Sequence, residues 1–225
     1  QRKDLSLFAA MQDIAAAPKV DLAGKQPALP PLGQRIAVAR DVAFGFCYPH
    51  VLDDWRAAGA DISFFSPLQD KAPDLDADAV YLPGGYPELH AAALAANQTF
   101  LSGLRGAADK GAVILGECGG YMVLGQGVVD ADGGRHAMAG LLNLETTFAT
   151  RKLHLGYRQM CLLADGILGS HGGRYRGHEF HYASILREDG DSLYEIHDAL
   201  GEQAGKVGLC AGNVMGSFIH LIDIE

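Results

Sequence analysis

Short apolar runs recur through the first half of the chain, separated by segments with helical spacing. The runs are residues 36–39, 62–65, 79–82 and 112–115, each with the length of a buried strand. Two helix faces lie between them, one made of Val51, Leu52, Trp55 and Ala58 and one made of Phe100, Leu101, Leu104 and Ala108. Gly59 is a natural end for the first helix. Strands alternating with helices predict a doubly wound, mostly parallel α/β sheet.

The pattern changes after residue 124. Residues 130–134 form a turn signal, and residues 146–149, 157–163, 178–185 and 192–196 are expected to be strands. Few helical periods separate them, which predicts an antiparallel extension of the sheet. Residues 34–225 are therefore expected to form one domain. Residues 1–33 are expected to be a helical tail, with Leu7, Met11 and Ile14 at helical spacing, followed by a proline-rich linker.

Composition narrows the function classes. Among 225 residues, 48% are hydrophobic and 20% charged, which is ordinary for a globular protein. The net charge of −9, without a basic run, argues against a nucleic-acid partner. No apolar run reaches membrane-spanning length. Cys47, Cys118, Cys161 and Cys210 form no C-x-x-C pair, so a reduced, cytoplasmic protein is expected, with no metal site.

Cys118 lies in the most informative segment, where an apolar run stops at Gly-Glu-Cys-Gly-Gly and a helix follows from Tyr121. Strand, glycine-flanked turn and helix is the geometry of a nucleophile elbow, here with cysteine in place of serine. Free N–H groups at such a turn favour a thiolate. A buried structural cysteine in a glycine-rich turn is the alternative, and this segment alone leaves both open.

Two other motifs complete a candidate catalytic set. His220 follows Gly216-Ser217-Phe218-Ile219 at the end of a predicted strand, from which a base can reach the cysteine. Gly84 and Gly85 also follow a strand, and their N–H groups suit an oxyanion hole together with that of Gly119. Each motif alone is weak evidence for catalysis, because the chain has nine histidines and Gly84-Gly85 by itself is best interpreted as a turn.

In order, Pro83–Glu88 (P-G-G-Y-P-E), residues 116–122 (G-E-C-G-G-Y-M) and residues 216–220 (G-S-F-I-H) resemble the class I glutamine amidotransferase domain of flavodoxin-like type. The subgroup is that of the cobyric-type corrinoid amidases. Two further segments, L-H-L-G-Y-R at 153–158 and R-G-H-E-F-H-Y at 176–182, narrow the resemblance to the cobyrinic or hydrogenobyrinic acid a,c-diamide synthases. The resemblance covers residues 34–222.

The resemblance implies a glutaminase. Cys118 would attack the side-chain amide of glutamine and His220 would carry the proton to the departing ammonia. Gly84, Gly85, Gly119 and Tyr121 would bind glutamine and its oxyanion. The ammonia would serve to amidate corrin a- and c-acetate carboxylates in cobalamin biosynthesis, at a synthetase domain that uses ATP and Mg²⁺.

The chain departs from the family pattern in two ways. It contains no phosphate-loop motif, so no cofactor is expected in this chain, and we expect a fragment whose first 33 residues form the join to an N-terminal synthetase domain. Many class I domains also place a glutamate two residues after the histidine, where this chain has Ile222 and then Asp223. A Cys–His pair is therefore expected. Glu179 is an outside candidate for an orienting group, with a structural or surface carboxylate favoured.

Other readings stay open. His178 and His181 are three residues apart on a predicted strand, so their side chains would point to opposite faces and would not readily share a metal. Five basic residues offer contacts to a polycarboxylate corrinoid or a synthetase domain, or form a solvated face: Arg151, Lys152, Arg158, Arg174 and Arg176. Three alternative functions remain for the chain: the glutaminase domain of adenosylcobyric acid synthase, a non-catalytic docking domain, or a cysteine hydrolase or peptidase. A homodimer is also left open.

Overall fold

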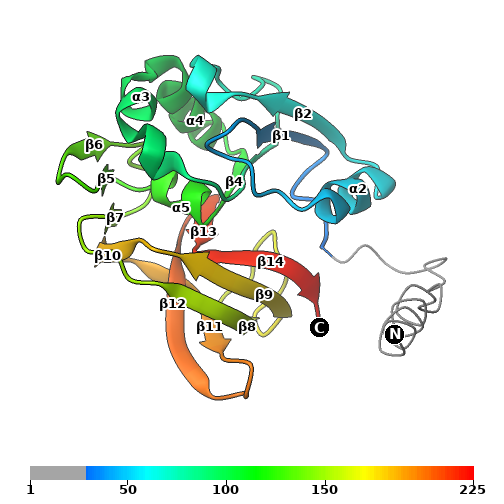
Figure 1. Ribbon diagram of the computed structural model, residues 1–225. Helices are drawn as coiled ribbons and strands as arrows, with labels where there is room; N and C mark the ends of the chain where they lie inside the picture. Colours follow the sequence, from blue (N-terminus) through cyan, green and yellow to red (C-terminus); the bar gives the residue numbers. More distant parts are fainter. Residues whose placement is uncertain (1–28) are drawn as a thin grey trace, which may run out of the picture.

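The computed structural model describes residues 29–225 and is built around one large curved sheet (Figure 1). Five neighbouring strands of this sheet are parallel, in the order β13-β4-β3-β1-β2. They are β1 (Arg35–Ala39), β2 (Asp61–Phe65), β3 (Ala79–Leu82), β4 (Val113–Glu117) and β13 (Val214–Ser217). The predicted parallel sheet is confirmed, and its carboxyl edge carries both glycine-rich motifs.

Helices cover both faces of the parallel strands, as the predicted winding requires. They are α2 (Pro49–Ala57), α3 (Ala91–Ala96), α4 (Gln98–Asp109) and α5 (Gly119–Leu124), with short 3₁₀ turns at Pro67–Gln69 and Pro87–His90. On one face, Trp55 of α2 packs edge-on against Tyr81, with ring centroids 5.4 Å apart. On the other, Phe100 of α4 packs against Phe44 and Phe65. None of the described helices is long and apolar enough to cross a bilayer.

Two details of the helix predictions need correction. Gly59 does follow α2 with φ +95°, but Ala58, expected on the buried face, is exposed, and Ala60 beyond the glycine is buried instead. The helix ends one residue early, so Ala58 no longer follows its periodicity. The short helix α3 has no counterpart in the sequence predictions because its six residues, mostly alanine, show no distinctive period.

The antiparallel extension is also confirmed, and it continues the same sheet through β12, β11, β8, β9 and β14. These strands are β8 (His154–Leu162), β9 (Arg174–His181), β11 (Asp191–His197), β12 (Gln203–Ala211) and β14 (Ile219–Ile224). The extension curls so far that β14, at the sheet's edge, returns to the parallel strands. There the Leu221 N–H donates to the Glu117 carboxylate at 3.2 Å.

A smaller sheet has the order β10-β7-β5-β6 and lies beside α3 and α5 (Figure 1). Its strands are β5 (Gly127–Val129), β6 (Arg135–Ala137), β7 (Leu144–Thr147) and β10 (Ser184–Glu188). The turn at residues 130–134 joins β5 to β6. The single strand predicted over 178–185 is wrong: it is the end of β9 and the start of β10, in different sheets. Fully buried Ala183 lies in the break between them.

Residues 1–28 lie outside the described part of the chain, so the predicted helical tail falls there together with most of the predicted linker. The other three cysteines, Cys47, Cys161 and Cys210, are free and half-buried.

Candidate active site

Cys118 lies at a tight turn between β4 and α5, the strand–turn–helix order that the sequence predicts. Its backbone has φ 48° and ψ −104°, a conformation that costs energy for a residue with a side chain. Its N–H donates to Ser217 O at 2.8 Å, which ties the turn to β13. The turn is tight enough to require glycine, because a Cβ at Gly120 would meet Leu82 O at 1.9 Å.

His220 is the second residue of β14, just beyond the break at Phe218 that separates β14 from β13. β13 runs parallel to β4 with Ser217 opposite Glu117, so β14 and its histidine begin just beyond the end of the strand beside β4. Its ring is buried and stacks on His178 of β9, with centroids 4.8 Å apart. The sequence places His220 at the end of one strand; the structure divides that segment into two.

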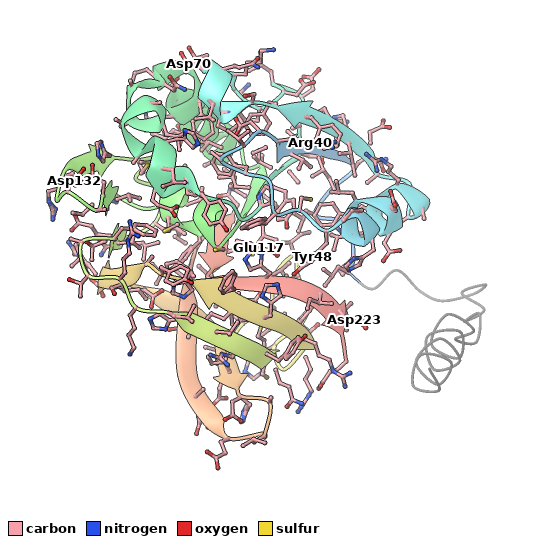
Figure 2. All side chains as sticks on the ribbon, viewed as in Figure 1. Arg40, Tyr48, Asp70, Glu117, Asp132 and Asp223 are labelled. Atoms are coloured by element: carbon pink, nitrogen blue, oxygen red, sulfur yellow. The ribbon has the colours of Figure 1, made fainter. Side chains whose placement is uncertain are left out.

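The glycine motif after β3 borders both residues. A Cβ on Gly84 would lie 2.3 Å from Cε1 of His220, so the imidazole lies against the bare α-carbon. A Cβ on Gly119 would lie 3.1 Å from the backbone nitrogen of Gly85. The three predicted motifs therefore meet in one buried corner. Glu117, the residue before Cys118, marks this corner in Figure 2, where it lies between the helix-bearing half and the antiparallel strands.

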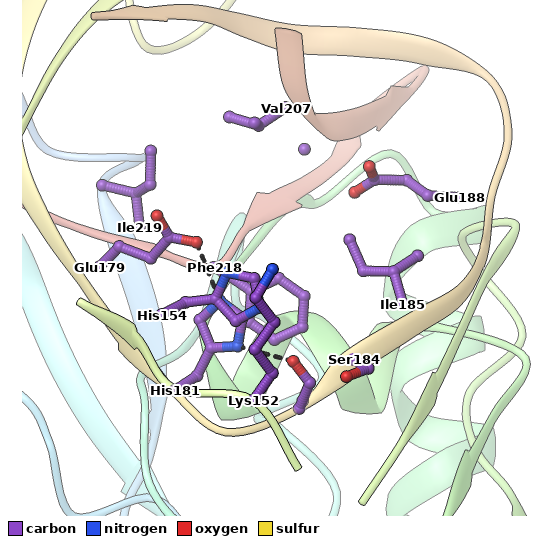
Figure 3. Close-up of a pocket in the computed structure, with 12 residues that line it drawn as sticks. Lys152, His154, Glu179, His181, Ser184, Ile185, Glu188, Val207, Phe218 and Ile219 are labelled. Carbon is purple, nitrogen blue, oxygen red and sulfur yellow. Dashed lines mark hydrogen bonds and ion pairs between the residues drawn. The ribbon is translucent and has the colours of Figure 1, made fainter. Parts of the chain in front are cut away.

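Two other predicted site residues have different surroundings. Tyr121 is buried in the core, with its ring edge-on to Phe218 and its hydroxyl donating to Glu188 at 2.6 Å. Glu179 forms an ion pair with Arg158 at 2.8 Å. It also forms a hydrogen bond with His181 at 2.9 Å (Figure 3). Glu179 thus pairs with Arg158 and His181, and its orienting role stays a prediction.

The strand-face argument about the two histidines agrees with the register. His178 faces His220, whereas His181 stacks on Phe218 and on His154 of β8. His154, Glu179 and His181 bring their ligand atoms within 4.8 Å of one another. Arg158 already neutralises the carboxylate of that group, so the charge that would attract a cation is compensated.

Three of the five basic residues noted in the sequence are paired. Arg158 pairs with Glu179, and the side chains of Arg174 and Arg176 hold Glu225 at 2.6 and 3.0 Å. Arg151 and Lys152 are exposed on the segment that precedes β8.

Burial keeps the two candidate catalytic groups neutral at rest. It raises the pKa of the Cys118 thiol to about 12, with nearby carboxylates adding to the effect and a hydrogen bond from the Gly119 N–H opposing it. It lowers the pKa of His220 to about 4, with His178 and His181 contributing. A thiol that is neutral at rest would need a base to take its proton before it could act as a nucleophile.

Glu117 is the residue that the sequence reading missed. It is fully buried, and its Oε2 lies 3.9 Å from Nδ1 of His220. The carboxylate accepts hydrogen bonds from the Tyr81 hydroxyl at 2.8 Å and from the Leu221 N–H. Burial raises its pKa to about 7. Its position directly before the cysteine is visible in the motif, but the residues considered from the sequence as possible partners of the histidine are Asp223 and Glu179.

A cysteine at a strained strand–helix turn, a buried histidine beside it and bare glycine backbone around both form the arrangement of cysteine-dependent amide hydrolases on an α/β sheet. Comparison with known proteins gives the same class. The chain belongs to the CobB/CobQ-like glutamine amidotransferase domain family, whose model matches residues 35–223.

Curated relatives share this sequence closely. The chain is 57% identical over 208 residues to hydrogenobyrinate a,c-diamide synthase from Sinorhizobium sp., covering 92% of this chain and 47% of the relative. It is 52% identical over 219 residues to the protein of the same name from Rhodobacter capsulatus, covering 95% and 50%. The chain thus spans about half the length of the curated relatives it matches.

Solved structures share the fold at low identity. PurLQS from Thermotoga maritima aligns with a TM-score of 0.58 at 19% identity, covering 83% of this chain and 86% of that one. A glutamine amidotransferase from the same organism aligns with a TM-score of 0.51 at 15% identity, covering 83% and 75%. The class I glutamine amidotransferase fold expected from the sequence is confirmed.

Proposed function

We propose that this chain is the glutaminase part of an ATP- and glutamine-dependent corrinoid a,c-diamide synthase in cobalamin biosynthesis. The observation that carries the proposal is the meeting of Cys118, His220 and Gly84 in one buried corner of a glutamine amidotransferase domain. Identity above 50% to two hydrogenobyrinate a,c-diamide synthases supports the choice of acceptor.

The proposed reaction begins with transfer of the Cys118 thiol proton to His220 as the sulfur attacks the glutamine amide carbon. Backbone N–H groups of Gly85 and Gly119 stabilise the oxyanion. The tetrahedral intermediate collapses to a glutamyl thioester, and His220 gives its proton to the leaving ammonia. Water, deprotonated by His220, then releases glutamate and restores the thiol.

The acceptor half of the reaction belongs to the remaining length of the relatives. ATP with Mg²⁺ would activate a corrin carboxylate there, and the ammonia would form the amide. Glutaminase of an adenosylcobyric acid synthase is the second candidate, favoured by the shared domain family. Defined corrin acids distinguish the two: amidation at the a- and c-acetates supports the first proposal, and amidation at other carboxylates supports the second.

An exposed apolar strip beside the site supports a docked synthetase. It consists of Leu153, Leu155, Tyr157, Phe180 and Tyr182, on and next to β8 and β9. Leu155 and Tyr157 are 65% and 70% exposed. The strip adjoins the site because the carbonyl of Phe180 accepts the Cys118 thiol at 3.8 Å. A contiguous exposed apolar surface is typical of a protein interface.

Replacement of the nucleophile tests the glutaminase. Cys118→Ala should abolish glutamate release from glutamine and labelling by a glutamine-derived chloroketone. Cys161→Ala, at a half-buried cysteine on β8, is the matched control and should retain both. Full turnover by Cys118→Ala would rule out the proposed chemistry. Peptide cleavage without glutamine turnover would instead indicate a peptidase.

The docking surface has its own test. The unmatched half of the Sinorhizobium sp. relative, added in trans, should bind the chain, and Leu155→Ser/Tyr157→Ser should weaken that binding at least ~10-fold. Leu200→Ser, at an 86% exposed residue on the β11–β12 turn, is the control. Equal binding by the double variant would contradict this docking surface. Binding without ammonia release would favour a docking domain without catalytic activity.

A further inference from the structure

The position at which class I domains carry their third catalytic side chain is unsuitable here. Ile222 is apolar, and Asp223 is an exposed residue opposite Arg176 in the β14–β9 register. The Asp223 carboxylate instead accepts the Ile224 N–H at 2.8 Å. Neither residue supplies a buried acceptor to the histidine ring.

Nδ1 of His220 nevertheless needs a partner. It is buried and has no hydrogen-bond partner among the described residues. An unsatisfied buried N–H costs about 1–3 kcal/mol, and the cost rises when the ring becomes an imidazolium. In the proposed reaction the ring takes the thiol proton on Nε2, so Nδ1 must carry its own proton and face an acceptor.

Glu117 is the acceptor in position. Its Oε2 lies 3.9 Å from Nδ1, and both side chains are buried. The Tyr81 hydroxyl and the Leu221 N–H hold the carboxylate at both oxygens. Since Leu221 follows His220 directly, the same carboxylate fixes the strand that carries the ring. A hydrogen bond that is long in the free enzyme often tightens when the ring gains charge.

We propose that Glu117 is the positioning carboxylate of this site, holding His220 in the tautomer with the proton on Nδ1 and stabilising its imidazolium. The third member of the set thus precedes the nucleophile in the chain instead of following the base. The inference rests on the glutaminase function proposed above. Atoms balance without a further reactant: the thiol proton moves to Nε2, the Nδ1 proton stays in place, and Glu117 remains ionised.

Several titratable groups face this pair. His178 stacks on His220, and Tyr48 packs edge-on with a centroid distance of 6.4 Å. The groups whose ionisation is coupled electrostatically to Glu117 are Cys47, Tyr48, Tyr81, Cys118 and Tyr194. All of these raise their pKa values with burial and are neutral near pH 7. The remaining titratable groups at the pair are His178 and His181, which both lower the pKa of His220.

The first test is Glu117→Gln, whose amide can still accept the Leu221 N–H and donate to Tyr81. Its NH₂ would face Nδ1 and select the wrong tautomer, so kcat should fall roughly 10²–10⁴-fold with little change in KM for glutamine. Glu117→Asp should recover part of the loss. Asp223→Asn is the matched control and should behave as wild type. Wild-type kcat in Glu117→Gln would overturn the proposal.

The acid limb of the pH profile of kcat/KM distinguishes a positioning role of Glu117 from a purely structural role. In the wild type it should follow ionisation of Glu117, whose pKa burial raises to about 7. In Glu117→Gln the limb should move well below pH 7, because burial lowers the pKa of His220 itself to about 4. A limb that stays in place would contradict the assignment.

The second test needs no turnover and no variant. Side-chain ¹⁵N NMR of the wild-type chain at pH 7.5 should show His220 protonated on Nδ1. An Nε2-protonated ring would overturn the proposal whether or not glutamine is hydrolysed. Conversely, the predicted tautomer in a protein that does not hydrolyse glutamine would contradict the proposed function and leave the pairing intact.

Discussion

Replacement of Gly84 by alanine tests whether the histidine and the glycine motif meet as described. A Cβ at this position would lie 2.3 Å from Cε1 of His220. Two carbon atoms are in van der Waals contact at about 3.5 Å, so the His220 ring must move away by about 1 Å. The backbone itself tolerates alanine, because Gly84 does not have a positive φ. The N–H proposed for the oxyanion also stays in place.

The expected cost falls on catalysis more than on the fold. A displacement of about 1 Å in a reacting group can reduce the rate about 10²-fold, equivalent to about 2.7 kcal/mol of barrier. Overpacking in the buried corner should lower stability by roughly 1–3 kcal/mol. Gly84→Ala should therefore remain folded at room temperature and hydrolyse glutamine about 10²-fold more slowly.

Gly106→Ala is the matched control. Gly106 lies within α4, and a Cβ there meets nothing within 4 Å. This variant should gain roughly 0.5–1 kcal/mol in helix stability and keep full activity. Glutamate release, chloroketone labelling of Cys118 and a thermal melt are measured for both. Wild-type turnover and labelling by Gly84→Ala would refute the contact between Gly84 and His220, and with it the geometry of the site.

Three further predictions follow from burial. Phe100→Ala should cost about 3–5 kcal/mol of unfolding free energy in urea titrations while the folded fraction keeps its activity, because Phe100 is fully buried and its ring packs on Phe44 and Phe65, which are not candidate site residues; a cost below about 1 kcal/mol would contradict the packing. Alkylation of Cys118 by iodoacetamide should accelerate up to pH 10 without a plateau, because its pKa is raised to about 12; a plateau near pH 7 would indicate a thiolate at rest. The stability of Glu117→Gln should fall on acidification from pH 6.5 to pH 4 by about 2 kcal/mol more than that of the wild type, as measured by denaturant titration; parallel pH profiles would contradict the raised pKa of Glu117.

The sign of the last prediction follows from the opposite pKa shifts of Glu117 and His220. The raised pKa of Glu117 gives stability that is present below its ordinary value of 4.5 and lost as the pH rises to about 7. The lowered pKa of His220 gives stability that is present above its ordinary value of 6.5 and lost as the pH falls to about 4. In the wild type the two slopes oppose each other between pH 4.5 and 6.5. Glutamine at position 117 removes the compensating one.

The sequence was sufficient for four of the five parallel strands, since β1 to β4 are short apolar runs, and for the turn at Cys118, since its glycines are where the backbone is most crowded. The strand break at Ala183 was hidden because residues 178–185 contain no glycine or proline that would mark a turn. The surroundings of Tyr121 were also hidden, since its partner Glu188 lies on β10 in the second sheet.

Glu117 shows most clearly why part of the site needed the structure. Its neighbour in sequence is the cysteine, but its contact with His220 exists only because the ten-stranded sheet curls until β14 meets the end of β4. No periodicity along the chain encodes that curl. A local motif therefore named the nucleophile, while the partner of the base depended on long-range topology.

The most direct test of the central claim is to trap the acyl intermediate. After rapid mixing with glutamine and acid quenching, mass spectrometry of the digested protein should find one glutamyl group on the peptide that carries Cys118, formed as ammonia is released. The thioester should be absent from Cys118→Ala and should accumulate little in Glu117→Gln. Ammonia release from the wild type with no glutamyl group on Cys118 at any quench time, or with the group on another cysteine, would contradict the account.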